Sequence, residues 1–274
     1  MNYMDYLKTQ DFPLFWCGGC GNGAVLGAIV RSFAALCYSK EETVVVTGIG
    51  CWGKADDYVT TNSFHGTHGR ALAFATGIKL ANPKLQVVVL MGDGDGVTIG
   101  GNHFIHAARR NVDVTAILVN NYNYGMTGGQ YSGSTPLNSI TSTSRYGHIE
   151  EGFDICQLAI AAGAPFVART SSDDPLAMQR FITAGLNKKG FSLIEVIAPC
   201  PTHFGKNNGM RNAADLMKWV KERSISVARA HTMNEEELAL KLIMGILTDT
   251  EREDYGSKYS RVIAAAQEGR RDIK

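Results

Sequence analysis

Three short runs of apolar residues place the strongest constraint on the fold. They are TVVVT (43–47), QVVVLM (86–91) and TAILV (115–119). Each is rich in β-branched residues and is soon followed by glycine or asparagine, which is typical of buried strands. Segments with helical spacing separate them, and a further helix at 174–188 precedes a strand at 191–197. Buried strands that alternate with helices predict an α/β fold with a parallel sheet covered by helices on both faces.

The sequence changes character after residue 203. It becomes polar and helix-prone, with few candidate strands, and helices are predicted at 216–220 and 235–247. We therefore expect one main domain over 1–203 and a mainly helical C-terminal extension over 204–274.

The charge balance and the apolar runs exclude several classes of partner. Lys and Arg number 27 against 26 Asp and Glu, so no global field attracts nucleic acid or an anionic membrane. No apolar run is long enough to span a bilayer, and MNYMDYLKTQDFPLF at the start lacks the basic and apolar regions of a signal peptide. We expect a cytoplasmic protein with no nucleic-acid or membrane partner.

Two aspartates lie between glycines directly after the strand at 86–91. Asp93 and Asp95 belong to the sequence GDGDG, and Asn121 follows the strand at 115–119. If these strands are neighbours, Asp93 and Asn121 meet at the carboxyl edge of the sheet, where such folds bind ligands. Carboxylate and carboxamide oxygens suit Mg²⁺, which commonly keeps phosphate oxygens in its shell. An aspartate after a strand is often only a turn or cap residue, but the YGMTGGQ that follows favours a diphosphate site.

The cysteines form a second candidate site. In a cytoplasmic chain they are more often thiols or metal ligands than disulfides. Cys37 and Cys156 lie in apolar helical contexts and are expected to be inert core thiols. The other four lie in a C-x-x-C motif or at predicted chain bends: Cys17, Cys20, Cys51 and Cys200.

Three kinds of site are possible for these four thiols. A redox dithiol would use the C-x-x-C pair alone, but the strand expected before such a motif is missing. A structural zinc site more often shows two close C-x-x-C pairs. Four thiolates from distant points also suit a 4Fe–4S cluster. The chemistry of the thiols alone leaves zinc and the cluster about even.

Taken together, the motifs resemble a known family. GDG followed a little under thirty residues later by a metal-binding asparagine resembles the thiamin diphosphate signature. Over roughly residues 12–210, the order of WCGGCGNG, GIGCWGK, FHGTHGRA, GDGDGVTIGGNHFIHAARRN, NNYNYGMTGGQ and APCPT is similar to the β subunit of 2-oxoacid:ferredoxin oxidoreductases, most of all the 2-oxoglutarate type. Thiamin-dependent decarboxylation leaves an electron-rich adduct that needs an oxidant, which favours the iron–sulfur cluster over zinc.

The resemblance assigns roles to individual residues. It implies one 4Fe–4S cluster on the four cysteines, and Mg²⁺ on Asp93, the Asn121 side chain and the Asn123 carbonyl. Asp95 either caps the next helix, which we favour, or touches the diphosphate. The residues expected around the cofactors are Gly50, Cys51, Gly92, Asp93, Gly94, Asp95, Asn121, Asn123, Gly125, Met126 and Thr127.

Three further residues are catalytic candidates. His65 and His68 flank a glycine turn in FHGTHGR, and their place in the family suggests contacts near the diphosphate or the reacting carbon. Lys54, three residues after Cys51, could bind a substrate carboxylate as a point charge. A solvated loop lysine is an equally good interpretation of Lys54.

The resemblance implies an oxidative decarboxylase. It would convert a 2-oxo acid, with 2-oxoglutarate leading and pyruvate and branched acids open, to acyl-CoA and CO₂, with coenzyme A as co-substrate and electrons passed to ferredoxin. An α subunit completes the active site in the family, so this chain alone should be inactive. The alternatives are a non-oxidative thiamin decarboxylase or synthase with structural zinc, and a non-catalytic electron-transfer subunit.

Overall fold

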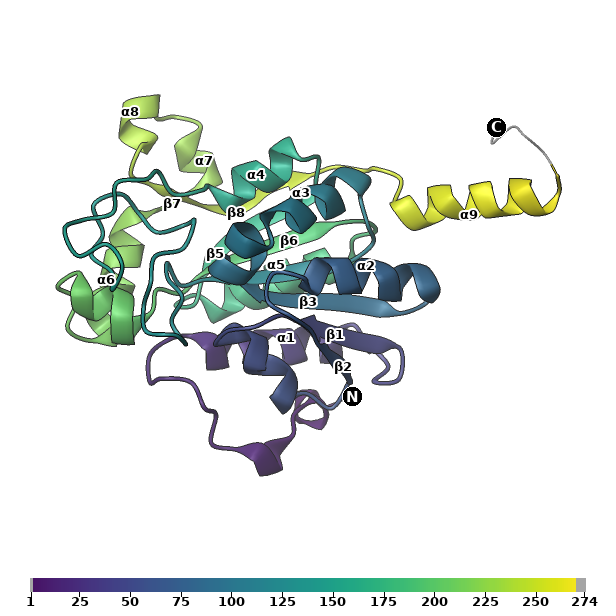
Figure 1. Ribbon diagram of the computed structural model, residues 1–274, viewed down its shortest axis with the longest axis horizontal. Coiled ribbons are helices and arrows are strands. Elements are labelled where there is room, and N and C mark those ends of the chain that lie inside the picture. Colours follow the sequence, from purple (N-terminus) through teal and green to yellow (C-terminus); the bar gives the residue numbers. More distant parts are fainter. Residues whose placement is uncertain (1, 270–274) are drawn as a thin grey trace.

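The computed structural model describes residues 2–269, which form one eight-stranded sheet in the order β2-β1-β3-β4-β6-β5-β8-β7 (Figure 1). The strands are β1 (Thr43–Thr47), β2 (Asn62–His65), β3 (Gln86–Gly92), β4 (Thr115–Asn120), β5 (Phe166–Ser171), β6 (Ser192–Ile197), β7 (Ser224–Ser226) and β8 (Leu242–Asp249). The first six strands in spatial order are parallel, and β8 pairs antiparallel with β5. The predicted α/β class is confirmed.

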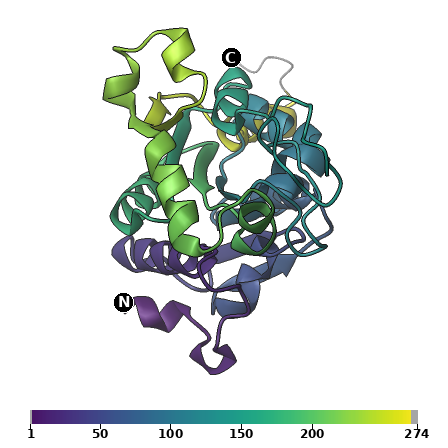
Figure 2. The same cartoon turned by 90° about the vertical axis from the view of Figure 1, so that its left-hand side faces the viewer.

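Helices cover both faces of this sheet. The α-helices are α1 (Asn22–Ala35), α2 (Ala71–Ala81), α3 (Gly101–Arg110), α4 (Ile155–Ala161), α5 (Pro175–Asn187), α6 (Ala213–Arg223), α7 (Val227–Ala230), α8 (Glu235–Leu238) and α9 (Tyr255–Gln267). Short 3₁₀ segments are Tyr3–Tyr6, Thr9–Asp11 and Trp52–Tyr58, and π-helical turns are Gly94–Ile99 and Pro201–Gly205. In the views of Figures 1 and 2, the N-terminal segment and the α7–α8 region lie at opposite ends of the molecule.

The core divides into two layers because strand side chains alternate between faces. Val88, Leu90 and Ile117 pack with α1 and α5 on one side. Val87 and Val89 pack with α2, α3 and α4 on the other side. Both sides are apolar, so the central strands are buried on both faces, as expected for parallel strands.

The C-terminal segment differs from the sequence expectation. The predicted helix over 235–247 is wrong: only Glu235–Leu238 is helical, and Leu242–Asp249 is the strand β8. Gly245 adopts a φ of 138°, which a helix cannot contain, and pairing with β5 stabilises the extended form. The segment after residue 203 thus contributes helices and also two strands to the same sheet.

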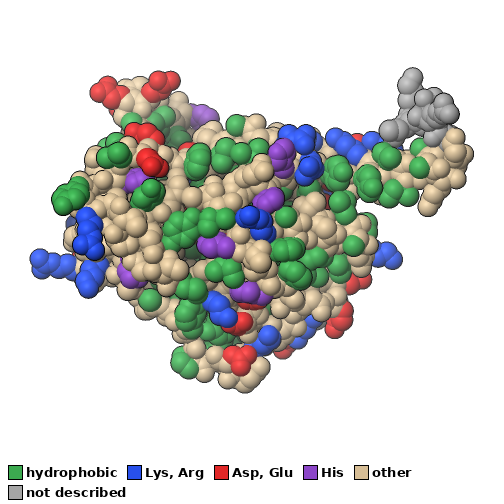
Figure 3. Space-filling view, viewed as in Figure 1, with side chains coloured by type: hydrophobic (Ala, Val, Ile, Leu, Met, Phe, Trp, Pro, Cys, Tyr) green, Lys and Arg blue, Asp and Glu red, His purple; other side chains and the backbone are tan. Residues whose placement is uncertain are grey.

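On the face shown in Figure 3, acidic side chains gather mainly at the upper left and lower right and basic ones lie in separate small groups, so no field of one sign covers this face. No helix within residues 2–269 is both long enough and apolar enough to cross a bilayer.

The parallel order brings three strand ends to one edge. β3 lies between β1 and β4, with Thr47 opposite Leu90 and Gly92 opposite Val119. The loops that begin at Gly48, Asp93 and Asn121 therefore start side by side. This is the adjacency on which the predicted cation site depends.

Candidate active site at the carboxyl edge of the sheet

Asp93 is held rigidly at the end of β3. Its side chain is buried, and the hydroxyls of Ser132 and Ser134 donate to Oδ2 at 2.5 and 2.8 Å. Burial raises the pKa of Asp93, against the opposing effect of the two serine hydroxyls. Buried carboxylates are usually paired with a cation or coordinate a metal, because an isolated buried charge is costly. The geometry therefore suits a cation ligand.

The asparagine loop after β4 supplies polar atoms that lack partners. Asn121 Oδ1 accepts from the Asn123 amide at 3.2 Å. Neither side-chain polar atom of Asn123 has a hydrogen-bond partner within the described residues, although both are buried. Asp95 Oδ2 is in the same state. Buried polar atoms are nearly always paired, so these orphaned atoms indicate a group that binds here.

All the residues expected around the cofactors line one small cavity. Its volume is about 70 Å³, and every member of that set lines it, from Gly50 and Cys51 to Met126 and Thr127. Ile49, Trp52, His68 and Tyr124 complete its lining. The structure thus brings these residues together around one cavity, and their roles stay predictions.

Asp95 does not cap a helix, so the interpretation we favoured from the sequence is wrong. Its Oδ1 accepts from the Gly69 amide at 2.7 Å and from the Ile49 amide at 3.3 Å. The same oxygen lies 2.6 Å from His68 Nδ1. A Cβ built on Gly48 would come within 2.1 Å of Asp95 Oδ2, so the loop after β1 needs glycine there. Asp95 joins three loops and orients His68.

The three catalytic candidates do not converge. His68 lines the cavity, with its ring edge-on to Tyr124. His65 is not among the residues that line it, and its Nδ1 lies 3.1 Å from Asp56 Oδ2 and 3.0 Å from Thr47 Oγ1.

Lys54 is likewise absent from the residues that line this cavity. It forms an ion pair with Asp57 at 2.5 Å, and both side chains are partly exposed. The roles of His65 and Lys54 stay predictions, and each would have to act from outside the cavity.

The four candidate cysteines line a second cavity, of about 230 Å³. They come from the loop before α1, the end of β1 and the end of β6, and all are free thiols. Burial raises the pKa of Cys51 to about 11, with smaller contributions from the other three thiols, so the four interact electrostatically. Of the remaining pair, Cys156 is a buried core thiol as expected, whereas Cys37 is exposed at the end of α1.

The four sulfurs are not drawn together as the ligands of a single ion would be. Within residues 2–269, only Asp154, Cys156 and Glu195 place three potential ligand atoms within 4.8 Å of one another. Zn–S bonds of about 2.3 Å hold four thiolates close together, whereas a cluster separates its ligands.

The two cavities adjoin. Cys51, Asn121, Gly125 and Met126 line both of them. A Cβ on Gly125 would lie 3.5 Å from Cys51 Sγ and from Asn123 Oδ1, and 3.7 Å from Asn121 Nδ2. Gly125 thus lies between Cys51 and the side chains of Asn121 and Asn123.

Sequence analysis missed the serines that bind Asp93. Ser132 and Ser134 lie in QYSGSTP, which returns to the end of β3 after a loop without regular structure. The only local signal in the sequence was the pair of serines, Ser132 and Ser134, on either side of a glycine. Their partner is about forty residues away in sequence, so the contact itself could not be inferred.

Comparison with known proteins agrees with this geometry. Residues 48–196 match the thiamine pyrophosphate enzyme, C-terminal TPP binding domain family. The 2-oxoglutarate synthase subunit KorB of Methanocaldococcus jannaschii is 45% identical over 260 residues, 95% of this chain and 96% of that protein. The subunit of the same name from Archaeoglobus fulgidus is 52% identical over 220 residues, 80% of each chain.

A solved structure is also similar. It is the 2-oxoglutarate:ferredoxin oxidoreductase from Magnetococcus marinus with 2-oxoglutarate, coenzyme A and succinyl-CoA bound. Its TM-score is 0.87 at 28% identity, over 98% of this chain and 91% of that chain. With its fold, its carboxyl-edge site and these relatives, the chain belongs to the β subunits of the 2-oxoacid:ferredoxin oxidoreductases, within the thiamine pyrophosphate enzymes.

Proposed function

We propose that this chain is the β subunit of a 2-oxoglutarate:ferredoxin oxidoreductase that forms succinyl-CoA and CO₂ from 2-oxoglutarate and coenzyme A. The observation that carries the proposal is the shared wall between the two cavities, formed by Cys51, Asn121, Gly125 and Met126. Adjacent sites are what an oxidative decarboxylation needs, because the electrons released at one must reach the other. A zinc-containing, non-oxidative enzyme would have no use for that proximity.

The residues that line the carboxyl-edge cavity suit Mg²⁺ and the diphosphate of thiamin diphosphate. Asp93, Asn121 and Asn123 would hold the cation, and the glycines after β3 allow backbone amides close to phosphate oxygens. The unpartnered atoms of Asn123 and Asp95 support this assignment. When bound, thiamin diphosphate supplies the electron sink for decarboxylation.

The cysteine cavity fits a 4Fe–4S cluster. Cys17, Cys20, Cys51 and Cys200 would each supply a thiolate. The support is the set of four free thiols that line one cavity. When bound, the cluster supplies one-electron transfer toward ferredoxin.

His68 is the residue of this chain best placed to move a proton. Asp95 lies on its Nδ1, which leaves Nε2 as the ring nitrogen free to face the cavity. A carboxylate on one ring nitrogen fixes the orientation of the imidazole. His68 would therefore exchange a proton with the substrate through Nε2, while Asp95 holds the ring in place.

The relatives support the remaining assignments. The names of these relatives specify 2-oxoglutarate, and the solved relative binds 2-oxoglutarate, coenzyme A and succinyl-CoA. As a β subunit, this chain would act with an α subunit that completes the site, pass electrons to ferredoxin and work in the cytoplasm.

The test is a spectroscopic one on the complex with its α subunit, purified without oxygen. We expect broad visible absorbance that bleaches when 2-oxoglutarate and coenzyme A are added, and a weaker response to pyruvate or a branched 2-oxo acid. Cys51→Ser should lose iron, while Cys37→Ser, at an exposed cysteine outside the cavity, should behave as the wild type. An iron-free, colourless complex that still turns over would contradict the proposal.

A further inference from the structure

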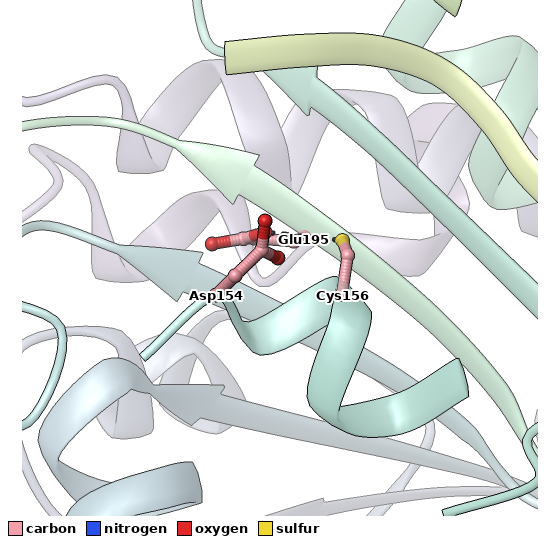
Figure 4. A group of neighbouring side chains, drawn as sticks. All are labelled: Asp154, Cys156 and Glu195. Carbon is pink, nitrogen blue, oxygen red and sulfur yellow. Dashed lines mark hydrogen bonds between the residues drawn. The ribbon is translucent and has the colours of Figure 1, made fainter. Parts of the chain in front are cut away.

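One group of side chains outside the two cavities has the spacing of a metal site. Asp154 and Cys156 lie at the start of α4, and Glu195 points toward them from β6 (Figure 4). The possible ligand atoms are already used within the chain, because Arg169 pairs with both carboxylates and the Cys156 thiol donates to Glu195 Oε2 at 3.1 Å. The group is therefore complete without a metal.

The backbone around the four cysteines of the second cavity is held by hydrogen bonds. The Cys20 amide donates to the Cys17 carbonyl at 3.2 Å, which closes the C-x-x-C segment into a turn. The Cys200 amide donates to the Asn121 carbonyl at 3.1 Å, which ties this cysteine to the asparagine loop. Neither of these bonds connects the C-x-x-C turn with Cys51, although all four cysteines line the same cavity.

Trp16 makes the connection between the C-x-x-C turn and Cys51. It directly precedes Cys17, and its indole Nε1 donates to the Cys51 carbonyl oxygen at 2.6 Å. Trp16 also lines the cysteine cavity. The hydrogen bond uses the backbone of Cys51, so it leaves the thiol available to iron.

Two buried aromatic side chains fix the Trp16 ring. Its centroid lies 5.7 Å from that of Trp52 and 5.3 Å from that of Tyr58, which are 2% and 6% exposed. Trp52 Nε1 donates to the Ile117 carbonyl at 3.2 Å, so the aromatic group is attached to the central strand β4. Trp16 therefore has a defined place from which to hold Cys51.

A second hydrogen bond joins the same two segments. Tyr58 Oη accepts from the Phe15 amide at 2.8 Å, two residues before Cys17. Tyr58 ends the 3₁₀ segment that begins directly after Cys51. The residues before Cys17 are thus attached at two points to the segment that starts with Cys51.

We propose that Trp16 is a positioning residue for the iron–sulfur cluster, because it sets the place of the C-x-x-C turn relative to Cys51 before iron binds. Ligands that are already in place pay less to become ordered when the metal centre binds. Without the indole N–H, Cys51 and the C-x-x-C turn would be free to separate, and the cluster would be lost more easily. The inference rests on the proposed function, since it concerns the ligands of the proposed cluster.

The experiment follows the release of iron from the αβ complex, purified without oxygen, to the chelator bathophenanthroline. Trp16→Phe keeps an aromatic ring and removes the indole N–H. It should release iron about three- to tenfold faster than the wild type, as expected for one lost hydrogen bond. The matched control is Trp219→Phe on α6, at a residue that is not among those lining the cysteine cavity, and it should release iron at the wild-type rate.

Electron paramagnetic resonance of the reduced cluster separates positioning from general destabilisation, because its g values respond to the arrangement of the ligands. Trp16→Phe should change the g values, whereas Trp219→Phe should leave them unchanged even if it lowers the thermal midpoint. Iron release at the wild-type rate in Trp16→Phe, or faster release with unchanged g values, would overturn the inference.

A second variant covers the case in which Trp16→Phe does not fold. Tyr58→Phe keeps its ring and removes the acceptor of the Phe15 amide, so it should release iron about twofold faster and change the g values in the same way. Wild-type behaviour of Tyr58→Phe would then overturn the inference. A wild-type complex that contains no iron would instead refute the proposed function.

Discussion

The two ends of the parallel strands differ in how their buried polar groups are satisfied. At the carboxyl ends, Asp95 Oδ2 and both side-chain polar atoms of Asn123 have no partner within residues 2–269. At the amino end of β4, Asp113 accepts from Lys79, Lys189 and the Gly190 amide, each at 2.8 Å.

Two hydroxyls near the amino ends, those of Thr61 and Ser192, also lack partners within the described residues, but a hydroxyl costs less to leave unpaired than a carboxylate. The contrast separates an edge shaped for a ligand from an edge that stabilises the fold. Polar residues at both edges are buried, so burial alone does not distinguish the two. The two edges are distinguished instead by whether their polar atoms have hydrogen-bond partners within the protein.

The largest effect is expected at the ligand edge. Asp93→Ala should weaken thiamin diphosphate binding by more than about 100-fold, because the main anion of the cation site is removed. The thermal midpoint of the cofactor-free complex should not fall, since a desolvated carboxylate is removed with it. Calorimetric titration and a thermal melt measure the two quantities. If Asp93→Ala strongly lowered the thermal midpoint but kept thiamin diphosphate binding, Asp93 would instead be a residue that stabilises the fold.

His68 provides the next test of the same edge. His68→Gln should lower kcat about 100-fold, the lower range for a general acid, with little change in cofactor affinity. The matched control is His103→Gln on α3, which lies outside the cavity. Steady-state assays with the α subunit present measure kcat and the cofactor affinity of each variant separately. Equal losses of kcat in His68→Gln and His103→Gln would show that His68 has no specific role in catalysis.

At the opposite edge the expected effect is on stability. Asp113→Asn leaves the largely buried Lys79 ammonium without its counter-ion, which should cost about 3 kcal/mol and lower the thermal midpoint. Cofactor affinity per folded complex should be unchanged.

The pH dependence of the Asp113 contribution has a definite sign. Burial alone would raise the pKa of Asp113, but Lys189, Lys79 and the Gly190 amide outweigh it and lower the pKa. The stabilisation is therefore complete above the pKa of the unfolded chain and is lost as pH falls through the lower, folded value. The difference between wild type and Asp113→Asn should persist at neutral pH and shrink only below about pH 4.

The smallest effect is expected at Lys54. Its ammonium pairs with Asp57 on a partly exposed turn, and the hydrogen bond that Lys54 donates to Asp57 raises the pKa of Lys54. Such pairs contribute little, so Lys54→Ala should change the KM for 2-oxoglutarate by no more than about twofold. A tenfold rise in KM would show that Lys54 reaches the substrate from outside the cavity.

The sequence by itself determined the parallel sheet and the meeting of Asp93 with Asn121. The runs QVVVLM and TAILV are apolar at every position after the first, as expected for a strand buried on both faces. Parallel neighbours must share their carboxyl edge. The family motifs also named the four cysteines, whose grouping around one cavity the structure then displayed.

Only the tertiary structure decided the contacts between loops. Ser132 and Ser134 reach Asp93, Asp95 binds the loops of Gly69 and Ile49, and Lys54 turns to Asp57. Strand β8 likewise forms where the local sequence favoured helix, because β5 offers an open edge. Periodicity encodes which face of an element is buried, but it carries no information about which distant loop completes a hydrogen bond. Those partners are fixed only when the whole sheet has assembled.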